Sequence, residues 1–60
     1  MYEIILYFAD WSGKIREAPV QTAIVPRAGE AVTFNGTNYV VAGVWHHYDE
    51  GFIAVALDVA

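Results

Sequence analysis

Residues 32–48 read VTFNGTNYVVAGVWHHY and contain the clearest turn signal in the chain. Asn35-Gly36 lies between two apolar runs. An Asn-Gly pair in that setting favours a two-residue hairpin turn in which both residues have positive φ. In the second run, side chains that face opposite sides of a strand alternate regularly until Gly43, where we predict a β-bulge. The stretch therefore predicts a tight antiparallel hairpin with one irregular strand.

A bulge at Gly43 changes which side chains share a face of the strand. On a regular strand, residues an even number of positions apart point to the same side. The bulge shifts that alternation by one residue in the second half of the strand. We therefore expect one face to carry Tyr39, Val41, Val44 and His46.

Strand signals continue on both sides of this hairpin. YEIILYFA at residues 2–9 has apolar residues at both alternating sets of positions, which is typical of a strand covered on both faces. Pro19 lies in the next run, and that strand must be at an edge or a bend because proline has no N–H for a ladder. The predicted strands are residues 2–9, 14–25, 32–34, 39–48 and 52–59, and in the last of them we expect Ile53, Val55, Leu57 and Val59 to face inward.

Tight connections separate these five strands. VPRAGEAV, at residues 25–32, reads as the loop between the second and third strands, and no helix longer than a turn is needed. Many short strands with tight turns are typical of small barrels and sandwiches. We predict an all-β fold: a small five-stranded, strongly bent antiparallel barrel of the SH3-like kind, with residues 1–60 as a single domain.

Length and composition limit how such a chain is stabilised. A domain of 60 residues buries only about 60% of the surface that its unfolded chain exposes, so its stability is marginal. The absence of cysteine excludes disulfides, thiolate–zinc sites and cysteine nucleophiles. Hydrophobic residues make up 57% of the chain, but no apolar run is long enough to span a bilayer. We expect no membrane contact, no signal peptide, and an apolar excess shared between core and surface.

The charge balance narrows the class of partner. The formal net charge is −4, from three basic residues against seven acidic ones. Three basic side chains cannot form the electrostatic footprint of phosphate binding, so we expect no direct contact with nucleic acid. A basic protein partner fits this charge, and so does the simpler interpretation that acidity keeps a small protein soluble.

The run HHYDE at residues 46–50 has the residue types of a metal or catalytic site. Neighbouring side chains on a strand point to opposite faces, so His46 and His47 cannot hold one metal ion without a bulge between them. We expect His46 to pack on the core side with one nitrogen hydrogen-bonded, and His47 to lie outside. Residues 49–51 are then the hairpin turn. We therefore expect neither a metal nor a cofactor.

Catalytic signals are equally weak, and we do not expect an enzyme. Ser12 is the only serine, and no glycine-framed nucleophile elbow surrounds it. Asp49 and Glu50 are adjacent on an exposed turn, whereas a paired-carboxylate mechanism needs two acids facing a cleft. A metal-dependent enzyme that uses the run at 46–50 is kept as a third hypothesis.

Aromatic and acidic residues occur together at two turns, and this combination favours protein binding. Tryptophan anchors interfaces because it buries a large area at a low entropy cost. Trp45 is expected to face outward, whereas Trp11 serves either as an interface anchor or as a lid on the barrel end. The predicted partner-binding residues are Asp10, Trp11, Trp45, Asp49 and Glu50, with Glu30 as a lesser candidate.

VPRAGEAVTFNGTNYVVAGVWHHYDEG, at residues 25–51, resembles a recurring pattern in small phage and mobile-element proteins. The pattern is a proline-arginine-x-glycine-acid loop, a strand, a glycine turn, then tyrosine-x-valine, a later valine and a histidine. YFADWSGKIREAPV, at residues 7–20, is similar to the first hairpin of such proteins. The matching residues are Pro26, Arg27, Gly29, Glu30, Val32, Gly36, Tyr39, Val41, Val44 and His46.

This resemblance implies a compact SH3-like protein encoded by a small stand-alone reading frame. Small acidic phage proteins of this sort are often inhibitors of host defence, including anti-CRISPR proteins, which occupy a nucleic-acid groove on an effector complex. The seven acids here are few and spread over every turn, so a short local site, such as the pocket that reads a protospacer-adjacent motif, fits better than a long duplex mimic. Function carried over from a fold-level likeness is an analogy.

Two functions from different classes follow. The first is a non-enzymatic phage-type inhibitor, acting in the cytoplasm of an infected bacterial host, whose acidic surface blocks a DNA site on a basic nucleic-acid-binding complex. The alternative is a structural homo-oligomeric or virion-associated β-barrel, a homodimer for example, that buries its apolar excess between subunits and has no host target.

Overall fold

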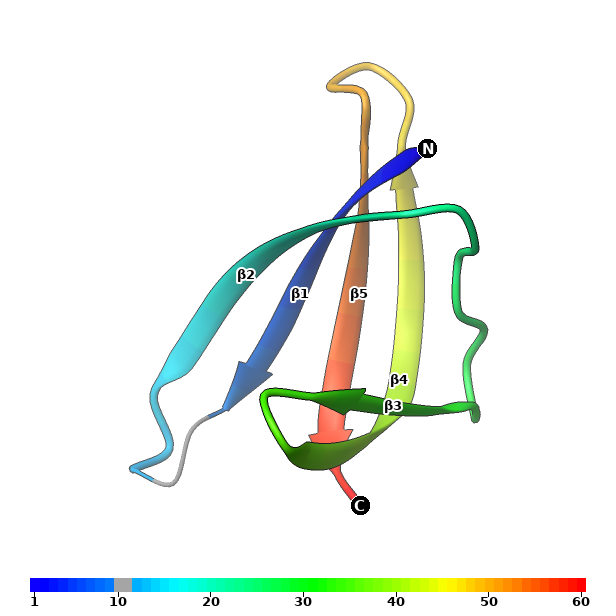
Figure 1. Cartoon of the computed structure of the whole chain (residues 1–60). Helices are drawn as coiled ribbons and strands as arrows, with labels where there is room; N and C mark the ends of the chain where they lie inside the picture. Colours follow the sequence, from blue (N-terminus) through cyan, green and yellow to red (C-terminus); the bar gives the residue numbers. More distant parts are fainter. Residues whose placement is uncertain (10–11) are drawn as a thin grey trace.

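The protein folds into one five-stranded sheet in a computed structural model, which describes residues 1–9 and 12–60. The strands are β1 (Tyr2–Ala9), β2 (Ile15–Thr22), β3 (Ala31–Phe34), β4 (Thr37–His47) and β5 (Phe52–Val59). Their order in the sheet is β2-β1-β5-β4-β3, and the sheet is curled into a half-barrel (Figure 1). The prediction of a five-stranded all-β fold is confirmed.

The prediction of an entirely antiparallel sheet is wrong at one pair of strands. β1 and β5 are parallel, with Ile4 opposite Ile53 and Tyr7 opposite Ala56, whereas the other three pairs are antiparallel. The chain alternates in direction from strand to strand, so the first and fifth strands point the same way and are parallel where they lie side by side (Figure 1). Residues 23–30 carry the chain from β2, at one edge of the sheet, to β3, at the other. β2 and β3 are the two edges of the sheet and do not pair with each other.

The local signals at the two irregular points of the sheet are confirmed. Asn35 and Gly36 form the β3–β4 turn with φ of 50° and 77°, as the Asn-Gly pair predicts. The ladder between β4 and β5 shifts register between Val41 and Gly43, which is the predicted bulge. These two features bend the β3–β4 hairpin across one end of the sheet.

β2 is shorter than the predicted strand at 14–25. The Thr22 hydroxyl donates to the Ile24 carbonyl at 3.2 Å and accepts from the Ile24 N–H at 3.3 Å. This local turn competes with the ladder and ends the strand. Pro19 lies in β2, which pairs only with β1, so its predicted position in an edge strand is confirmed.

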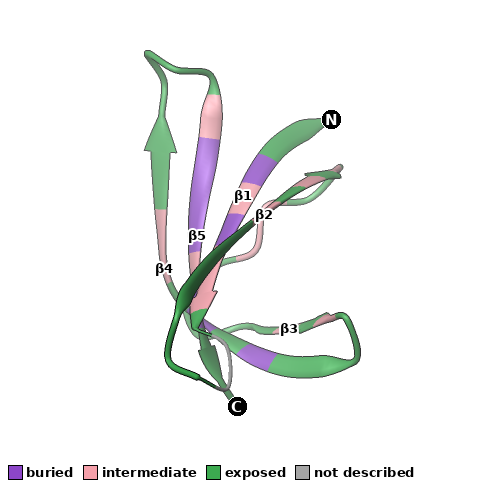
Figure 2. Cartoon of the chain, turned by 90° about the vertical axis from the view of Figure 1, so that its left-hand side faces the viewer, coloured by how far each residue is buried: buried purple, intermediate pink, exposed green. Residues whose placement is uncertain are grey.

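The core lies on the concave face of the half-barrel, where β1, β5 and the first part of β4 meet (Figure 2). Val55, at the centre of the sheet, is fully buried. Phe8 of β1 packs against Phe34 of β3, with ring centroids 5.9 Å apart, and so joins the two sides of the curl. The buried cluster consists of Ile4, Leu6, Tyr39, Val41, Ile53, Val55 and Leu57.

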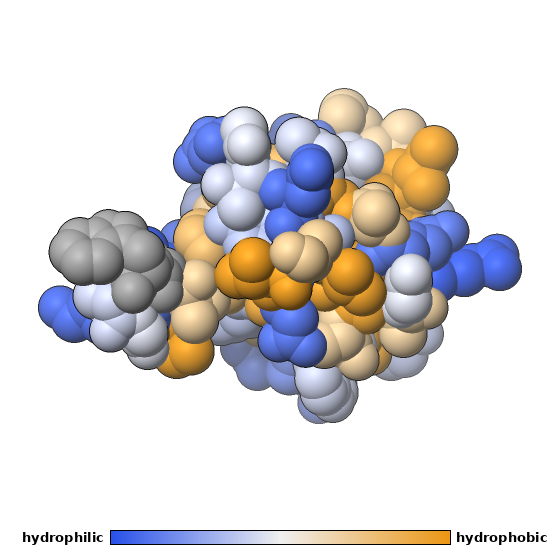
Figure 3. All heavy atoms as spheres, turned by 90° about the horizontal axis from the view of Figure 1, so that it is seen from below, coloured by the Kyte–Doolittle hydropathy of each residue, from blue (hydrophilic) through white to orange (hydrophobic). Residues whose placement is uncertain are grey.

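Two predictions about burial fail at the limits of this core. Val59 was expected to face inward, but it is 69% exposed, because the β1–β5 ladder ends at Ala56 and only β4 flanks the end of β5. β1 was expected to be covered on both faces, but Ile5 and Tyr7, on its convex side, are only half-buried. The apolar excess therefore reaches the surface, as the view from below also shows (Figure 3).

The described residues contain no helix, as predicted. It follows that this part of the chain has no helical segment with the length and apolar character that a membrane crossing requires.

Candidate binding surface at the β4–β5 hairpin

The hairpin between β4 and β5 is closed by the turn at residues 48–51. The Gly51 N–H donates to the His47 carbonyl at 2.9 Å. Gly51 has a φ of 78°, a value that is unfavourable for residues with a side chain. β3 pairs only with residues 37–40 of β4, so the outer half of β4 has β5 on one side and no strand on the other. The hairpin consequently ends in exposed side chains.

The burial of His46 differs from the prediction made from the sequence. His46 lies opposite Ile53, which places it on the concave face as predicted, but its side chain is exposed rather than packed in the core. Ile53, opposite it, is buried, but among the described residues no strand pairs with β4 at His46 on the β3 side, where only the loop residues 25–28 lie nearby. Its ring instead stacks with Tyr48, with centroids 5.9 Å apart and an interplanar angle of 28°.

His47 points to the other face of β4 and is exposed, as predicted. It stacks on its cross-strand partner Phe52 with ring centroids 4.5 Å apart and an interplanar angle of 17°. Because the two histidines point to opposite faces, they do not converge on one ion. Among the described residues, no group of three or more histidine, aspartate or glutamate side chains is placed to hold a metal.

Trp45 is exposed on the convex face, and its outward orientation agrees with the prediction. Its side chain is 56% exposed, and the ring lies back over Gly43. It also lies opposite Ala54, a buried residue of β5. An indole that is more than half exposed presents a large apolar surface, which is the property that interface anchors need.

The predicted acidic residues divide into two groups. Asp49 and Glu50 are exposed in the hairpin turn, close in the chain to Trp45. Glu30 is exposed in the connection between β2 and β3, where its Oε1 accepts from the Arg27 N–H at 2.6 Å. Glu30 therefore stabilises its own loop, and β3, which begins directly after it, lies at the opposite end of the sheet from the hairpin turn (Figure 1). Asp10 and Trp11, which were also predicted to bind a partner, lie outside the described residues.

Tyr7 adds a feature that the sequence did not indicate. Partial burial raises the pKa of its phenol, and the hydrogen bond to Glu17 and the charges of Glu17 and Glu50 raise it further. Tyr7 lies opposite Glu17 across the β1–β2 ladder. The charge of Glu50, in the hairpin turn, therefore acts on Tyr7 of β1.

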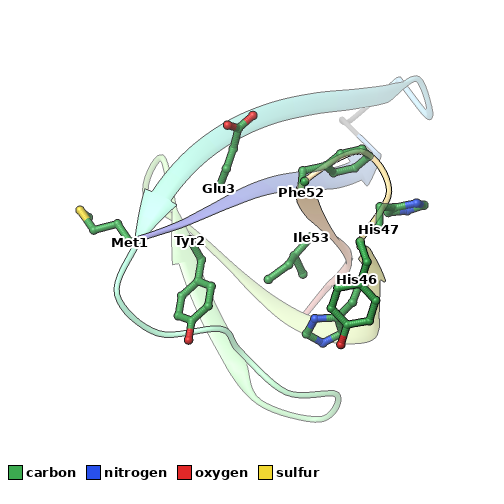
Figure 4. Close-up of a pocket in the computed structure, with 9 residues that line it drawn as sticks. Met1, Tyr2, Glu3, His46, His47, Phe52 and Ile53 are labelled. Carbon is green, nitrogen blue, oxygen red and sulfur yellow. The ribbon is translucent and has the colours of Figure 1, made fainter.

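A hollow of about 280 Å³ opens at the same end of the sheet. Ile53 lies at its centre, with Tyr2 of β1 to one side and His46 to the other (Figure 4). An adjoining hollow shares His46 and Tyr48 and is also lined by the two acids of the turn. Tyr2 was not among the predicted site residues, because only the parallel β1–β5 pairing brings it close to the hairpin.

Comparisons with known proteins identify no protein that is similar to this chain. No protein-family model matches the chain, and neither the curated proteins nor the solved structures contain a match.

Proposed function

We propose that the protein is a non-enzymatic binding protein that inhibits a basic, nucleic-acid-binding complex by occupying its surface. One observation carries this proposal: the exposed indole of Trp45 and the exposed carboxylates of Asp49 and Glu50 lie in one hairpin. Residues 44–52 include no lysine or arginine, so nothing within this segment neutralises the two acids. An exposed aromatic side chain and exposed carboxylates in the same hairpin suit a partner surface that is basic and partly apolar.

The arrangement favours a small contact site. Asp49 and Glu50 are adjacent, whereas Glu30 is used within its own loop. Such a surface covers a short stretch of a nucleic-acid groove, where carboxylates compete with phosphates for lysine and arginine side chains. The proposal therefore concerns a local site, such as a pocket that reads a protospacer-adjacent motif, and not mimicry of a long duplex.

The biological setting belongs to the same proposal. The resemblance of residues 25–51 to small phage and mobile-element proteins supports an inhibitor of host defence of the anti-CRISPR type, acting in the cytoplasm of an infected bacterium. The small, strongly bent five-stranded sheet supports an SH3-like description in its size and curvature, with a parallel β1–β5 pair as a departure from it.

Capture of partners from nuclease-treated bacterial lysate, read by mass spectrometry, tests the proposal. We expect the wild-type protein to retain a nucleic-acid-binding complex that added DNA or moderate salt displaces. Asp49→Lys with Glu50→Lys should abolish this capture and leave the fold intact, because both residues are exposed in the turn. A matched pair is Glu50→Lys and Asp58→Lys, which change the net charge equally at opposite ends of β5. Equal loss in both would contradict a site at the hairpin.

A second candidate, the homo-oligomeric structural protein, is favoured by the open side of the half-barrel. A hollow of about 290 Å³ lies between the two free edges, with Ile4 and Leu6 from β1, Val20 from β2 and Phe34 from β3 in its lining. Ile24, beside it, is 76% exposed. A second copy could cover this apolar surface. Sedimentation equilibrium decides the matter: a stable dimer whose dissociation unfolds the chain, with no partner captured, would replace the first proposal.

A further inference from the structure

The concave side of the hairpin end has aromatic walls and an aliphatic floor. Ile53 forms the floor, and its cross-strand partner His46, stacked with Tyr48, forms one wall. Tyr2 stands on the opposite side of the floor (Figure 4). Ile4 pairs with Ile53, and Tyr2 lies two residues before Ile4, so Tyr2 reaches the level of the turn. We call this site, defined by Tyr2, His46, Tyr48 and Ile53, the aromatic hollow.

Gly51 is part of the aromatic hollow, and a lack of space does not explain the glycine at this position. It belongs to the lining, and a Cβ added there would meet no heavy atom within 4 Å. The positive φ of this residue favours glycine, so the backbone conformation of the turn accounts for it.

The size of the aromatic hollow limits what it can accept. Its volume of about 280 Å³ is just below the range of roughly 300–1,000 Å³ that is typical of sites for whole small molecules and cofactors. It is open to solvent and is formed by side chains at the end of a sheet. These properties fit one inserted side chain of a larger partner better than a free metabolite.

The charges around the aromatic hollow select the class of side chain. The adjoining hollow shares His46, His47 and Tyr48 and adds Asp49 and Glu50, so two carboxylates lie next to the aromatic wall. Arg27 lines a different hollow on another side of His46. Aromatic faces attract cations through the ring quadrupole, and nearby carboxylates strengthen this preference.

We propose that the aromatic hollow binds the guanidinium of an arginine side chain presented by a protein partner. A guanidinium is planar, stacks on aromatic rings, is more weakly hydrated than an ammonium and can donate to carboxylates at its edge. Its face would lie against the rings of Tyr48 and Tyr2, and its N–H groups would reach the acids of the turn. The identity of the partner as a basic protein rests on the proposed function, whereas the affinity of the site for arginine does not.

Titration with a short probe peptide, acetyl-Gly-Arg-Gly-amide, tests this inference by nuclear magnetic resonance of the aromatic side chains. The control probe carries citrulline, which has nearly the shape of arginine and no charge. We expect saturable shifts at Tyr2, His46 and Tyr48 with the arginine probe and far weaker shifts with the citrulline probe. Tyr48→Ala should weaken binding by about two- to fivefold, because one exposed cation–π contact is lost.

The variants separate stacking from general attraction to acids. Tyr48 is 88% exposed, so its replacement does not remove core packing, and Tyr48→Ala keeps every carboxylate. Tyr48→Phe keeps the ring and should bind as the wild type does. Shifts of equal size with citrulline, unchanged affinity in Tyr48→Ala, or shifts that appear on dilution of the protein alone would each overturn the proposal. The last result would assign the hollow to a second copy.

This inference and the proposed function can fail separately. If the arginine probe leaves the aromatic hollow unperturbed while Asp49→Lys with Glu50→Lys still abolishes capture from lysate, the arginine site is wrong and the inhibitor proposal stands. If the probe binds as expected but no basic complex is captured, the site is real and the inhibitor proposal fails.

Discussion

The indole of Trp45 lies over Gly43 so closely that a Cβ added at Gly43 would be 2.7 Å from Cη2 of the ring. The two residues are on the convex side of β4, just after the bulge. The glycine is required here by the neighbouring ring and not by its own backbone conformation, because its φ is not positive. An aromatic ring that covers a strand glycine is a known means of stabilising a curved sheet.

Gly43→Ala should lower the free energy of unfolding by about 1 kcal/mol, at the low end of the cost of overpacking, because the half-exposed indole can move aside. Urea unfolding followed by circular dichroism measures this. In a Trp45→Ala background, the same substitution should be neutral or slightly stabilising, since alanine suits a strand better than glycine. Additive effects in this double-mutant cycle would show that the ring does not rest on Gly43.

Ile4 and Ile5 are neighbours on β1 and provide a matched test of the two faces of the sheet. Ile4 is 2% exposed in the core, whereas Ile5 is half-buried on the convex side. Ile4→Ala should cost about 2–5 kcal/mol, which is enough to unfold a domain of marginal stability. Ile5→Ala should leave a folded protein with a much smaller loss, measured by thermal unfolding. Equal losses would mean that another surface covers the convex face in solution.

Gly36 has a φ of 77° in the β3–β4 turn. Gly36→Val should destabilise the fold by about 1–2 kcal/mol or more, because a β-branched side chain is strained in that conformation. For a domain of this size each 1 kcal/mol corresponds to a Tm shift of about 4–8 °C, which calorimetry resolves. Asn35→Gly is the control, since glycine adopts the φ of 50° at that position without strain. A large loss from the control and none from Gly36→Val would contradict the turn geometry.

The raised pKa of Tyr7 predicts that the stability of the fold depends on pH in the alkaline range. The pKa of Tyr7 in the folded protein is raised above the ordinary value of 10.0, so folding favours the protonated phenol. The resulting stabilisation is present below the pKa of the unfolded chain and is lost as the pH rises through the pKa of the folded protein. Denaturant midpoints between about pH 9 and pH 11 should fall more steeply for the wild type than for Tyr7→Phe. Tyr48→Phe should decline as the wild type does; a decline in all three proteins alike would contradict the role of Tyr7.

Much of the fold follows from short-range chemistry. The Asn35-Gly36 turn, the bulge at Gly43 and the edge position of Pro19 were all predicted from the residues themselves. Each depends on φ preferences or on a missing N–H, which act within a few residues. At the site, alternation along β4 was enough to place Trp45 and His47 outward.

Signals within a few residues of the chain are enough to predict the strands, their turns and the exposed residues of the last hairpin. Only the packing of distant segments makes β5 parallel to β1, leaves Val59 beyond the core, and places His46 across the aromatic hollow from Tyr2. These facts depend on contacts between the two ends of the chain. Alternation fixes which face a side chain points to, but only the path of the chain at residues 23–30 selects which strand lies beside it.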